Sequence, residues 1–475
     1  MRVRLQLVLL LVLLAPLALP ADVIVFKSGR RVQAFRVEER GERIYYETED
    51  GQVGIPKHLV ERIERSDTFS SAGAATAGAA AAAEAPPPVD APELEAPEIK
   101  GVIQGDSINQ ELLLSLDRAA EQDGSEAARH RAVAARIVAA RFLARRNQWD
   151  AAGEMLRRAL AFAPKDSLLL LELAGVAYVQ QRFPAALEHL RPVLDDPAYA
   201  FEAHRLQGRI YYQREELDRA LAAWKRALTF QYDAELEALI EQVEREASIG
   251  KGLADRASGR FILRYEGGQE SGSRLAASIL AALDSTFDSI ASDFNVLPRE
   301  PIVVILYPNE TFYELTGMPP WVHGLFDGKI RVPVRGLASL SPRLETTLRH
   351  ELVHALLYLK TRNRAPRWLH EGLAQHIAGQ QLLVQAREFT PLFEARDGRG
   401  LWLVEDFFGG DQEQMLVAYQ ASLIVVETLE RRYGRGDMER FLEALARGES
   451  VEQSLRSAFR LTFEDLDRAV YDAIR

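Results

Sequence analysis

Three segments of this chain repeat with a period of 34 residues, and this period restricts the possible folds more than any other feature of the sequence. The segments are QWDAAGEMLRRALAFAP, RFPAALEHLRPVLDDP and ELDRALAAWKRALTF, with helix-length stretches between them. Small residues recur at one aligned position, at Ala152, Ala186 and Ala220. Large residues recur at another, at Leu156, Leu190 and Trp224. The pattern predicts stacked helical hairpins, because small residues let paired helices approach and large residues fill the seam to the next pair.

These segments resemble tetratricopeptide repeats, over roughly residues 130–245 and within a helical region expected at 101–250. The resemblance implies a groove in which a peptide or a partner protein binds. The alternative is that the array only supports the neighbouring domain, since about three units are the minimum for a stable stack. The sequence leaves both functions open.

The first 21 residues have the layout of a secretory signal peptide. Arg2 and Arg4 precede the apolar stretch LQLVLLLVLLAPLAL, and ALPA ends in a small residue at Ala21. We therefore expect an exported bacterial protein, periplasmic or extracellular, with no membrane span after cleavage. An uncleaved signal that anchors the chain is the alternative. The chain contains no cysteine, which excludes a disulfide framework, thiol catalysis and cysteine metal ligands.

Two further segments precede the repeats. Residues 22–66 contain short runs rich in β-branched and aromatic residues, separated by turn signals such as Asp50-Gly51, and predict a small all-β barrel of SH3-like or Sm-like shape. Residues 67–100 are rich in alanine and proline and predict an extended linker. The net charge of -11 comes without a long basic run, which excludes nucleic acid as a partner.

The stretch RHELVHALLYLK carries the clearest chemical signal. Ser341-Pro342 predicts the start of a helix whose leucines gather on one face. His350 and His354 lie one turn apart on roughly the opposite face, close enough for both to bind one Zn²⁺. The carboxylate of Glu351 can then act on a water molecule without being a ligand, which is the logic of the H-E-x-x-H pattern in metallopeptidases.

A third ligand is expected in the downstream stretch RAPRWLHEGLAQHIAG. A catalytic zinc normally has three protein ligands and one open position. Residues 355–370 separate His354 from Glu371, which is enough for a loop and an antiparallel return helix. The small residues Gly372 and Ala374 would let that helix pack closely on the first, so Glu371 is the expected third ligand.

HELVH followed by WLHEGLA resembles the gluzincin metallopeptidases, specifically the peptidase MA-like domains that are often joined to tetratricopeptide repeats in bacterial exported proteins. The resemblance covers about residues 252–430. It implies a thermolysin-like α+β domain, placed at 251–390 with a C-terminal helical part at 391–475. There His350, His354 and Glu371 would bind Zn²⁺, and Glu351 would be the general base acting on a protein or peptide substrate. The strand GKIRVPV would bind extended substrate by strand addition.

Other residues carry weaker expectations from the same resemblance. Relatives often place a tyrosine on a later helix as an oxyanion donor, so Tyr419 is a candidate, with a buried core tyrosine as the alternative. Gln375 stands where relatives frequently have an acidic residue that steadies a ligand histidine, and His370 and His376 flank the third ligand. No G-x-M-E-N stretch is present, so the amine pocket of related aminopeptidases is not expected.

The remaining histidines are given smaller roles. His323, in the loop PPWVHGLFDG, could line a cleft, although loop histidines are usually only solvated. The others are expected to be structural or exposed: His58, His130, His189 and His204.

The sequence thus predicts a multidomain chain with a small all-β barrel, an α-helical repeat array and an α+β metallopeptidase domain. The chief alternative is an inactive pseudo-peptidase whose repeats act as a protein-binding scaffold. A purely structural zinc site is disfavoured, because three ligands and a free carboxylate leave a coordination position open.

Overall fold

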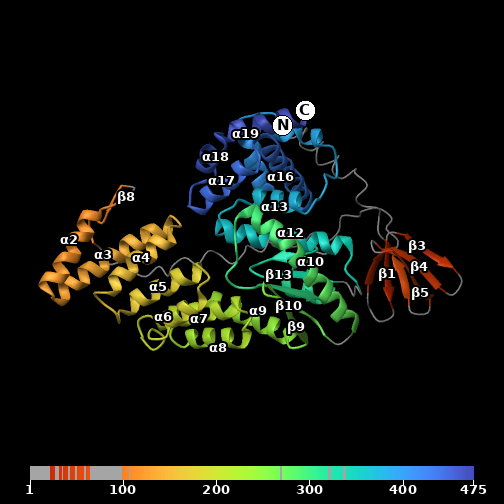
Figure 1. Ribbon diagram of the computed structural model, residues 1–475. Helices are drawn as coiled ribbons and strands as arrows, with labels where there is room; N and C mark the ends of the chain where they lie inside the picture. Colours follow the sequence, from red (N-terminus) through yellow and green to blue (C-terminus); the bar gives the residue numbers. More distant parts are fainter. Residues whose placement is uncertain are drawn as a thin grey trace.

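The structure is a computed structural model that describes residues 22–26, 31–34, 36–40, 43–48, 51–57, 60–64, 99–105, 107–267, 270–318, 322–334 and 339–475. Within these ranges it contains 18 α-helices and four small sheets (Figure 1). The predicted signal peptide and nearly all of the predicted linker lie outside the described residues. None of the described helices is long and apolar enough to cross a membrane.

Six short strands lie where the small β domain is expected. Strands β2, β1 and β6 form one antiparallel sheet, and β3, β4 and β5 form a second. The bounds are β1 Asp22–Phe26, β2 Arg31–Ala34, β3 Arg36–Arg40, β4 Arg43–Thr48, β5 Gly51–Pro56 and β6 Val60–Glu64. The run RVQAFRVEE is divided between the two sheets, because β2 belongs to the first and β3 to the second. Closure into a barrel stays a prediction.

The repeat region is a series of packed helical hairpins, drawn in orange to yellow-green in Figure 1. Helix α3 packs on α4, α5 on α6 and α7 on α8, and the short strands β7 and β8 precede the stack. The bounds are β7 Ile103–Gln104, β8 Ser107–Ile108, α2 Gln110–Asp123, α3 Glu126–Arg145, α4 Trp149–Leu160, α5 Ser167–Val179, α6 Phe183–Leu190, α7 Ala200–Gln213, α8 Leu217–Leu228 and α9 Ala234–Gly250. The expected helical hairpins are present.

Close approach between paired helices depends on the small residues. Ala152, Ala186 and Ala220 are fully buried. On α7, a Cβ added to Gly208 would lie 2.2 Å from Nε1 of Trp224 on α8, a separation that no real contact allows. Trp224, the largest of the aligned repeat residues, therefore fits only because Gly208 opposite it has no side chain.

A five-stranded mixed sheet begins the second half of the chain, which we call the mixed domain (residues 251–475). Its strand order is β12-β13-β11-β10-β9, with β10, β11 and β13 parallel and both edge strands antiparallel. The bounds are β9 Leu253–Ala257, β10 Phe261–Glu266, α10 Glu270–Phe294, β11 Ile302–Tyr307, α11 Asn309–Thr316, β12 Leu325–Phe326 and β13 Ile330–Pro333.

The central strand β11 is buried on both faces. Ile302, Val304 and Leu306 join the main core with helix α10, whereas Val303, Ile305 and Tyr307 pack against Phe312 of α11 on the other face. This alternation follows from the two-residue period of a strand. The apolar run IVVILY is therefore an interior strand, as its composition predicts.

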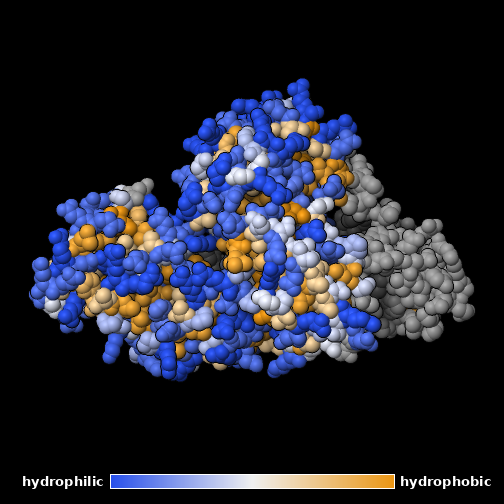
Figure 2. Space-filling model, in the orientation of Figure 1, coloured by the Kyte–Doolittle hydropathy of each residue, from blue (hydrophilic) through white to orange (hydrophobic). Residues whose placement is uncertain are grey.

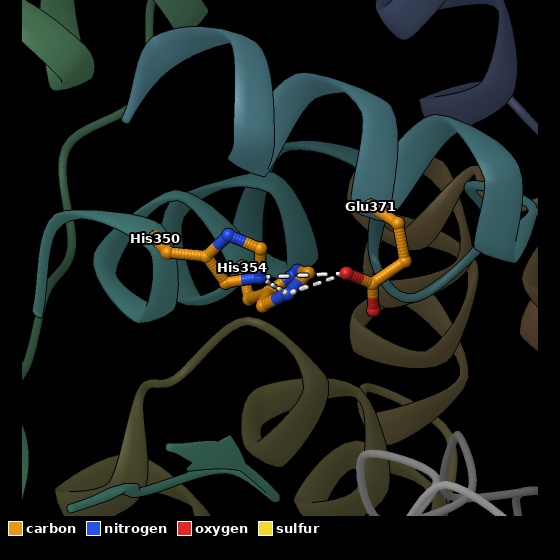
Figure 3. A group of neighbouring side chains, drawn as sticks. All are labelled: His350, His354 and Glu371. Carbon is orange, nitrogen blue, oxygen red and sulfur yellow. Dashed lines mark hydrogen bonds and ion pairs between the residues drawn. The ribbon is translucent and has the colours of Figure 1, made fainter. Parts of the chain in front are cut away.

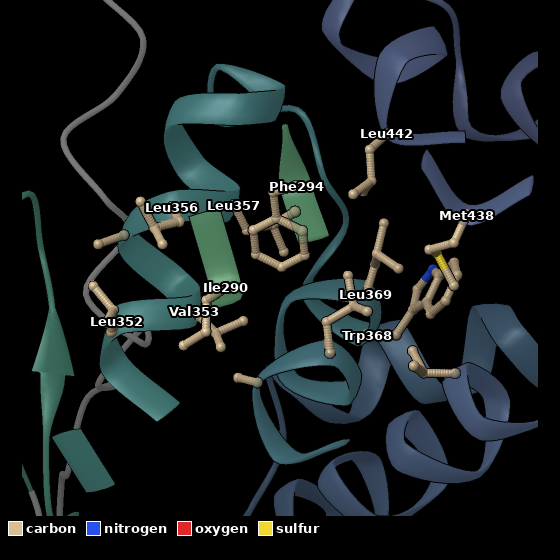
Figure 4. Packing of buried hydrophobic residues seen from close by; sticks show 14 of the residues in the cluster. Ile290, Phe294, Leu352, Val353, Leu356, Leu357, Trp368, Leu369, Met438 and Leu442 are labelled. Carbon is tan, nitrogen blue, oxygen red and sulfur yellow. The ribbon is translucent and has the colours of Figure 1, made fainter. Parts of the chain in front are cut away.

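One hydrophobic core continues from the sheet through the C-terminal helices, from Phe261 to Ile474. Figure 4 shows residues of this core on α12, among them Leu352 and Leu356, together with Trp368 and Leu369 of α13 and Met438 and Leu442 of α17. The two parts expected at 251–390 and 391–475 therefore share one core. The bounds are α12 Pro342–Thr361, α13 Arg367–Ile377, η2 Ala386–Phe389, α14 Thr390–Phe393, α15 Arg399–Phe407, α16 Gln412–Tyr433, α17 Arg435–Ala446, α18 Val451–Phe459 and α19 Phe463–Ile474.

The expected role of GKIRVPV as an exposed edge strand is wrong. The chain turns at Asp327-Gly328, and this hairpin folds Leu325 and Phe326 back onto Arg331 and Ile330. Strand β12 therefore forms the edge of the sheet, and β13 lies inside it.

Candidate metal centre

Helix α12 carries two histidines, and its N-terminus is capped by a side chain. Ser341 is its N-cap, and the hydroxyl accepts a hydrogen bond from the Leu344 backbone N–H at 3.2 Å. Leu348, Leu352 and Leu356 are buried in the main core. His350 and His354 are partly exposed, with side-chain exposures of 14% and 12%. The amphipathic pattern of the sequence therefore separates a core face from a face that carries imidazoles.

Three donor atoms converge between α12 and α13 (Figure 3). The Nε2 atoms of His350 and His354 are 3.1 Å apart. Oε2 of Glu371 lies 3.4 Å from the first and 3.6 Å from the second. Donors bound to one tetrahedral Zn²⁺ at ordinary bond lengths lie about 3.3–3.6 Å apart. The three expected ligands are therefore brought together at a separation suited to one metal ion.

The electrostatics of the group also fit a cation. Burial alone would raise the pKa of Glu371, but the imidazoles of His354 and His350 lower it well below its usual range. Burial would lower the pKa of His354, whereas Glu371 raises it. Oε2 of Glu371 is buried without a hydrogen-bond partner among the described residues. A buried, ionised oxygen without a donor is a position that a bound cation satisfies.

Helix α13, which carries Glu371, is held in place by contacts that the sequence does not predict. Its N-cap is Pro366, which offers no capping side chain. Instead the Glu405 carboxylate of α15 accepts hydrogen bonds from the backbone N–H groups of Arg367 and Trp368, both at 3.1 Å. An anion at this end of the helix also suits its dipole. Pro366 leaves an uncapped helix end in the sequence, but no local signal identifies Glu405 as the residue that caps it.

Packing of α13 on α16 requires a glycine. A Cβ on Gly372 would lie 2.4 Å from the Ser422 carbonyl oxygen and 2.5 Å from Cγ2 of Val426. Nε2 of Gln375 donates to the carbonyl of Tyr419 on α16 at 2.8 Å and to that of Glu371 at 3.0 Å. Gln375 thus joins α13 to α16 through backbone carbonyls. Its expected contact with one of the candidate ligand histidines stays a prediction.

Glu351 is buried at the same place, with 5% of its surface exposed. Burial raises the pKa of this carboxyl, which favours uptake of a proton. A Cβ on Gly324, just before β12, would lie 2.5 Å from Oε1 of Glu351. The backbone beside the edge strand therefore lies directly against this carboxylate, a contact that the sequence analysis missed.

Tyr419 faces the same group from α16. Its ring packs edge-on against Phe408 at 5.4 Å. The negative charge of Glu371, then burial, then Glu351 raise the pKa of Tyr419 well above its ordinary value. The phenol is therefore protonated at neutral pH and lies within the field of both carboxylates.

The two histidines that flank Glu371 differ in their distance from the three donors. The ring of His370 lies 5.6 Å from that of His354, and its buried Nε2 has no hydrogen-bond partner among the described residues. Burial and the His354 charge lower the pKa of His370 to about 3, so this histidine is neutral at pH 7. His376 points elsewhere and pairs with Glu430 at 2.8 Å.

The remaining histidines do not belong to the group of three donors. Among them, only His323 is adjacent in sequence to Gly324, which lies against Glu351. His323 precedes Gly324 and contacts Arg343 in the first turn of α12. His130, His189 and His204 lie in the repeat helices α3, α6 and α7. His58 lies outside the described residues.

Comparison of the chain with models of protein families and with curated proteins finds no match in either set. The assignment of a function therefore depends on the chain's own residues and their geometry.

Proposed function

We propose that this protein is an exported zinc metallopeptidase of the gluzincin type, with a tetratricopeptide-like array before its catalytic domain. One observation carries the proposal: the three donors of His350, His354 and Glu371 converge, and Glu351 lies beside them. Two imidazoles and one carboxylate form a donor set that suits Zn²⁺ better than Ca²⁺ or Mg²⁺. Three protein ligands leave a fourth position for water or substrate, as in catalytic sites.

The protein groups have separate tasks in peptide hydrolysis. Zn²⁺ bound to the three ligands would polarise the scissile carbonyl and lower the pKa of a water. Glu351 takes a proton from the attacking water and later delivers it to the leaving amine. The neutral Tyr419 hydroxyl donates a hydrogen bond to the oxyanion that develops on the former carbonyl.

Substrate binding is assigned to the edge of the sheet. Strand β12 is the edge, and the chain just before it contacts Glu351 through Gly324. An extended peptide that adds to this edge by main-chain hydrogen bonds would pass beside the base. The edge at Leu325–Phe326 replaces GKIRVPV in this role.

The test compares wild type with Glu351→Gln after purification. Zinc content is measured by elemental analysis, and cleavage is followed on a denatured-protein or peptide library. We expect about one zinc per chain in both forms and cleavage only by wild type, with chelation abolishing it and zinc restoring it. Glu345→Gln, on the exposed side of the same helix, is the matched control and should cleave normally.

Zinc in both forms without cleavage by either would reject the peptidase and support the scaffold alternative. Absence of zinc from wild type would reject the metal site itself.

A further inference from the structure

Three non-glycine residues with left-handed backbone mark equivalent turns of the repeat array. They are Asn147, Gln181 and Glu215, with φ of 59°, 54° and 61°. Each follows the first helix of its hairpin, and their spacing equals the repeat period of 34 residues. Equivalent positions of stacked repeats lie along one edge of the stack. We call this edge the turn row.

The first member of the turn row holds the segment between the two ligand helices. Residues 362–366, here called the ligand turn, connect α12 with α13. Nη1 of Arg362 donates to the Asn147 carbonyl at 2.6 Å, and Nη2 of Arg364 donates to the Arg145 carbonyl at 3.3 Å. Arg362 and Asn363 both have positive φ, of 55° and 60°. The array therefore contacts the ligand turn where its backbone has a conformation that L-residues rarely adopt.

The last member of the turn row binds the sheet. The Glu215 carboxylate accepts from Nη1 of Arg264 on β10 at 2.5 Å and pairs with Lys329 in the β12–β13 hairpin. Glu246, on α9 at the end of the array, lies 3.3 Å from Nζ of Lys329 and 3.0 Å from Nη1 of Arg331. The Tyr212 hydroxyl of α7 accepts from Nη2 of Arg331 at 3.0 Å.

These charges are buried and balanced. Lys329 and Arg331 are 1% and 2% exposed, and Glu246 is 3% exposed. Their hairpin leads directly to Gly324, which lies against Glu351. Separation of the array from the hairpin would break these ion pairs and expose Lys329 and Arg331, which the intact fold buries. In the view of Figure 2, the repeats and the sheet accordingly form one continuous surface in its lower half.

We propose that the repeat array positions the metal centre. Its turn row holds the ligand turn at one end and the β12–β13 hairpin at the other, so the array belongs to the framework of the site. Glu215 and Asn147 are positioning residues, because they act through Lys329 and Arg362 and touch neither metal nor substrate. The inference rests on the metal-dependent function proposed above.

The test uses the full chain with Arg362→Asn and Glu215→Gln. Asparagine tolerates the left-handed conformation at residue 362 but loses the guanidinium donor. Zinc affinity is measured by competition with a chromophoric chelator. Hydrogen exchange of residues 322–334 and 355–371 is measured in the metal-free protein. We expect the zinc dissociation constant to rise about tenfold in each variant, as for other supports of metal ligands. We also expect faster exchange in the segment that each contact holds.

Gln181→Asn is the matched control. It has the same place in the turn row, and no side-chain hydrogen bond or ion pair of Gln181 occurs among the described residues. This variant should match wild type in both measurements. Unchanged affinity and exchange in Arg362→Asn would overturn the inference, and this variant decides alone if Glu215→Gln does not fold. If wild type binds no zinc, the proposed function fails, and the exchange rates still decide whether the array holds the two segments.

Discussion

At the scale of single residues, the proposed chemistry depends on five side chains that come from three helices. His350, His354 and Glu351 come from α12, Glu371 from α13 and Tyr419 from α16. Two carboxylates lie close together here with opposite tendencies. The imidazoles keep Glu371 ionised, whereas burial raises the pKa of Glu351. Such a division suits one carboxylate to metal binding and the other to proton transfer.

Tyr419→Phe tests the oxyanion role. Because the hydroxyl would act only on charge that develops during the reaction, we expect kcat to fall about 100-fold with KM nearly unchanged. Zinc content should stay at the wild-type value. Tyr433→Phe, at the other end of α16, is the control. Equal kcat values for Tyr419→Phe and wild type would leave Tyr419 as a core residue only.

At the scale of elements, the site depends on how closely α13 packs on α16. Helix α13 reaches this distance because Gly372 lies against the Ser422 carbonyl, and Glu405 caps its first turn from α15. The position of α13 is therefore set mainly by its contacts with α15 and α16 and only partly by its own sequence.

Gly372→Ala should expose this dependence. The added methyl group meets backbone at 2.4 Å, so the helices must separate, and we expect the free energy of unfolding to fall by about 1–3 kcal/mol. Gly175→Ala on α5 is the matched control, because its Cβ would meet nothing within 4 Å. That change should stabilise the protein by up to about 1 kcal/mol, since alanine favours a helix. Chemical denaturation measures both, and similar values for the two variants would contradict the packing argument.

At the scale of the whole molecule, the repeat array and the mixed domain are joined by buried charges. Burial would raise the pKa of Glu246, but Lys329 and Arg331 lower it from 4.5 to about 2. A carboxyl whose folded-state pKa is lowered stabilises the fold above its unfolded-state pKa. That contribution disappears as the pH falls through the folded-state value. The junction should therefore weaken in acid, between about pH 4.5 and 2.

Glu246→Gln measures the strength of this junction. At pH 7 we expect its free energy of unfolding to be about 3 kcal/mol below that of wild type, because two buried cations lose a charged partner. The difference should shrink as the pH is lowered from 4.5 towards 2, where Glu246 of wild type also becomes neutral. Denaturant titrations at several pH values give the comparison. A difference that does not vary with pH would show that the charge of Glu246 is not what stabilises the junction.

The predictable parts of this protein were those with a short period or a short spacing. His350 and His354 lie one turn apart, so helix geometry alone places them together, and the repeat period predicts the hairpins. The contacts that support them join distant residues, such as Glu405 with Trp368, 37 positions away, and Lys329 with Glu246, 83 positions away. Contacts between residues so far apart in the sequence cannot be predicted from a repeat or a helical period. The position of β12 at the edge of the sheet was missed, because two residues are too few to show alternation.

The charged junction also limits how the chain can be divided into modules. A cut near Lys251 would place Glu215 and Glu246 on one fragment and Lys329 and Arg331 on the other. A protein without its repeats would therefore expose two cations that the intact fold buries. Loss of activity after such a deletion would not reveal whether the repeats recruit a substrate. The array is then not a cassette that can be removed, exchanged or grafted, and a recruiting role has to be sought with single changes on its outer surface.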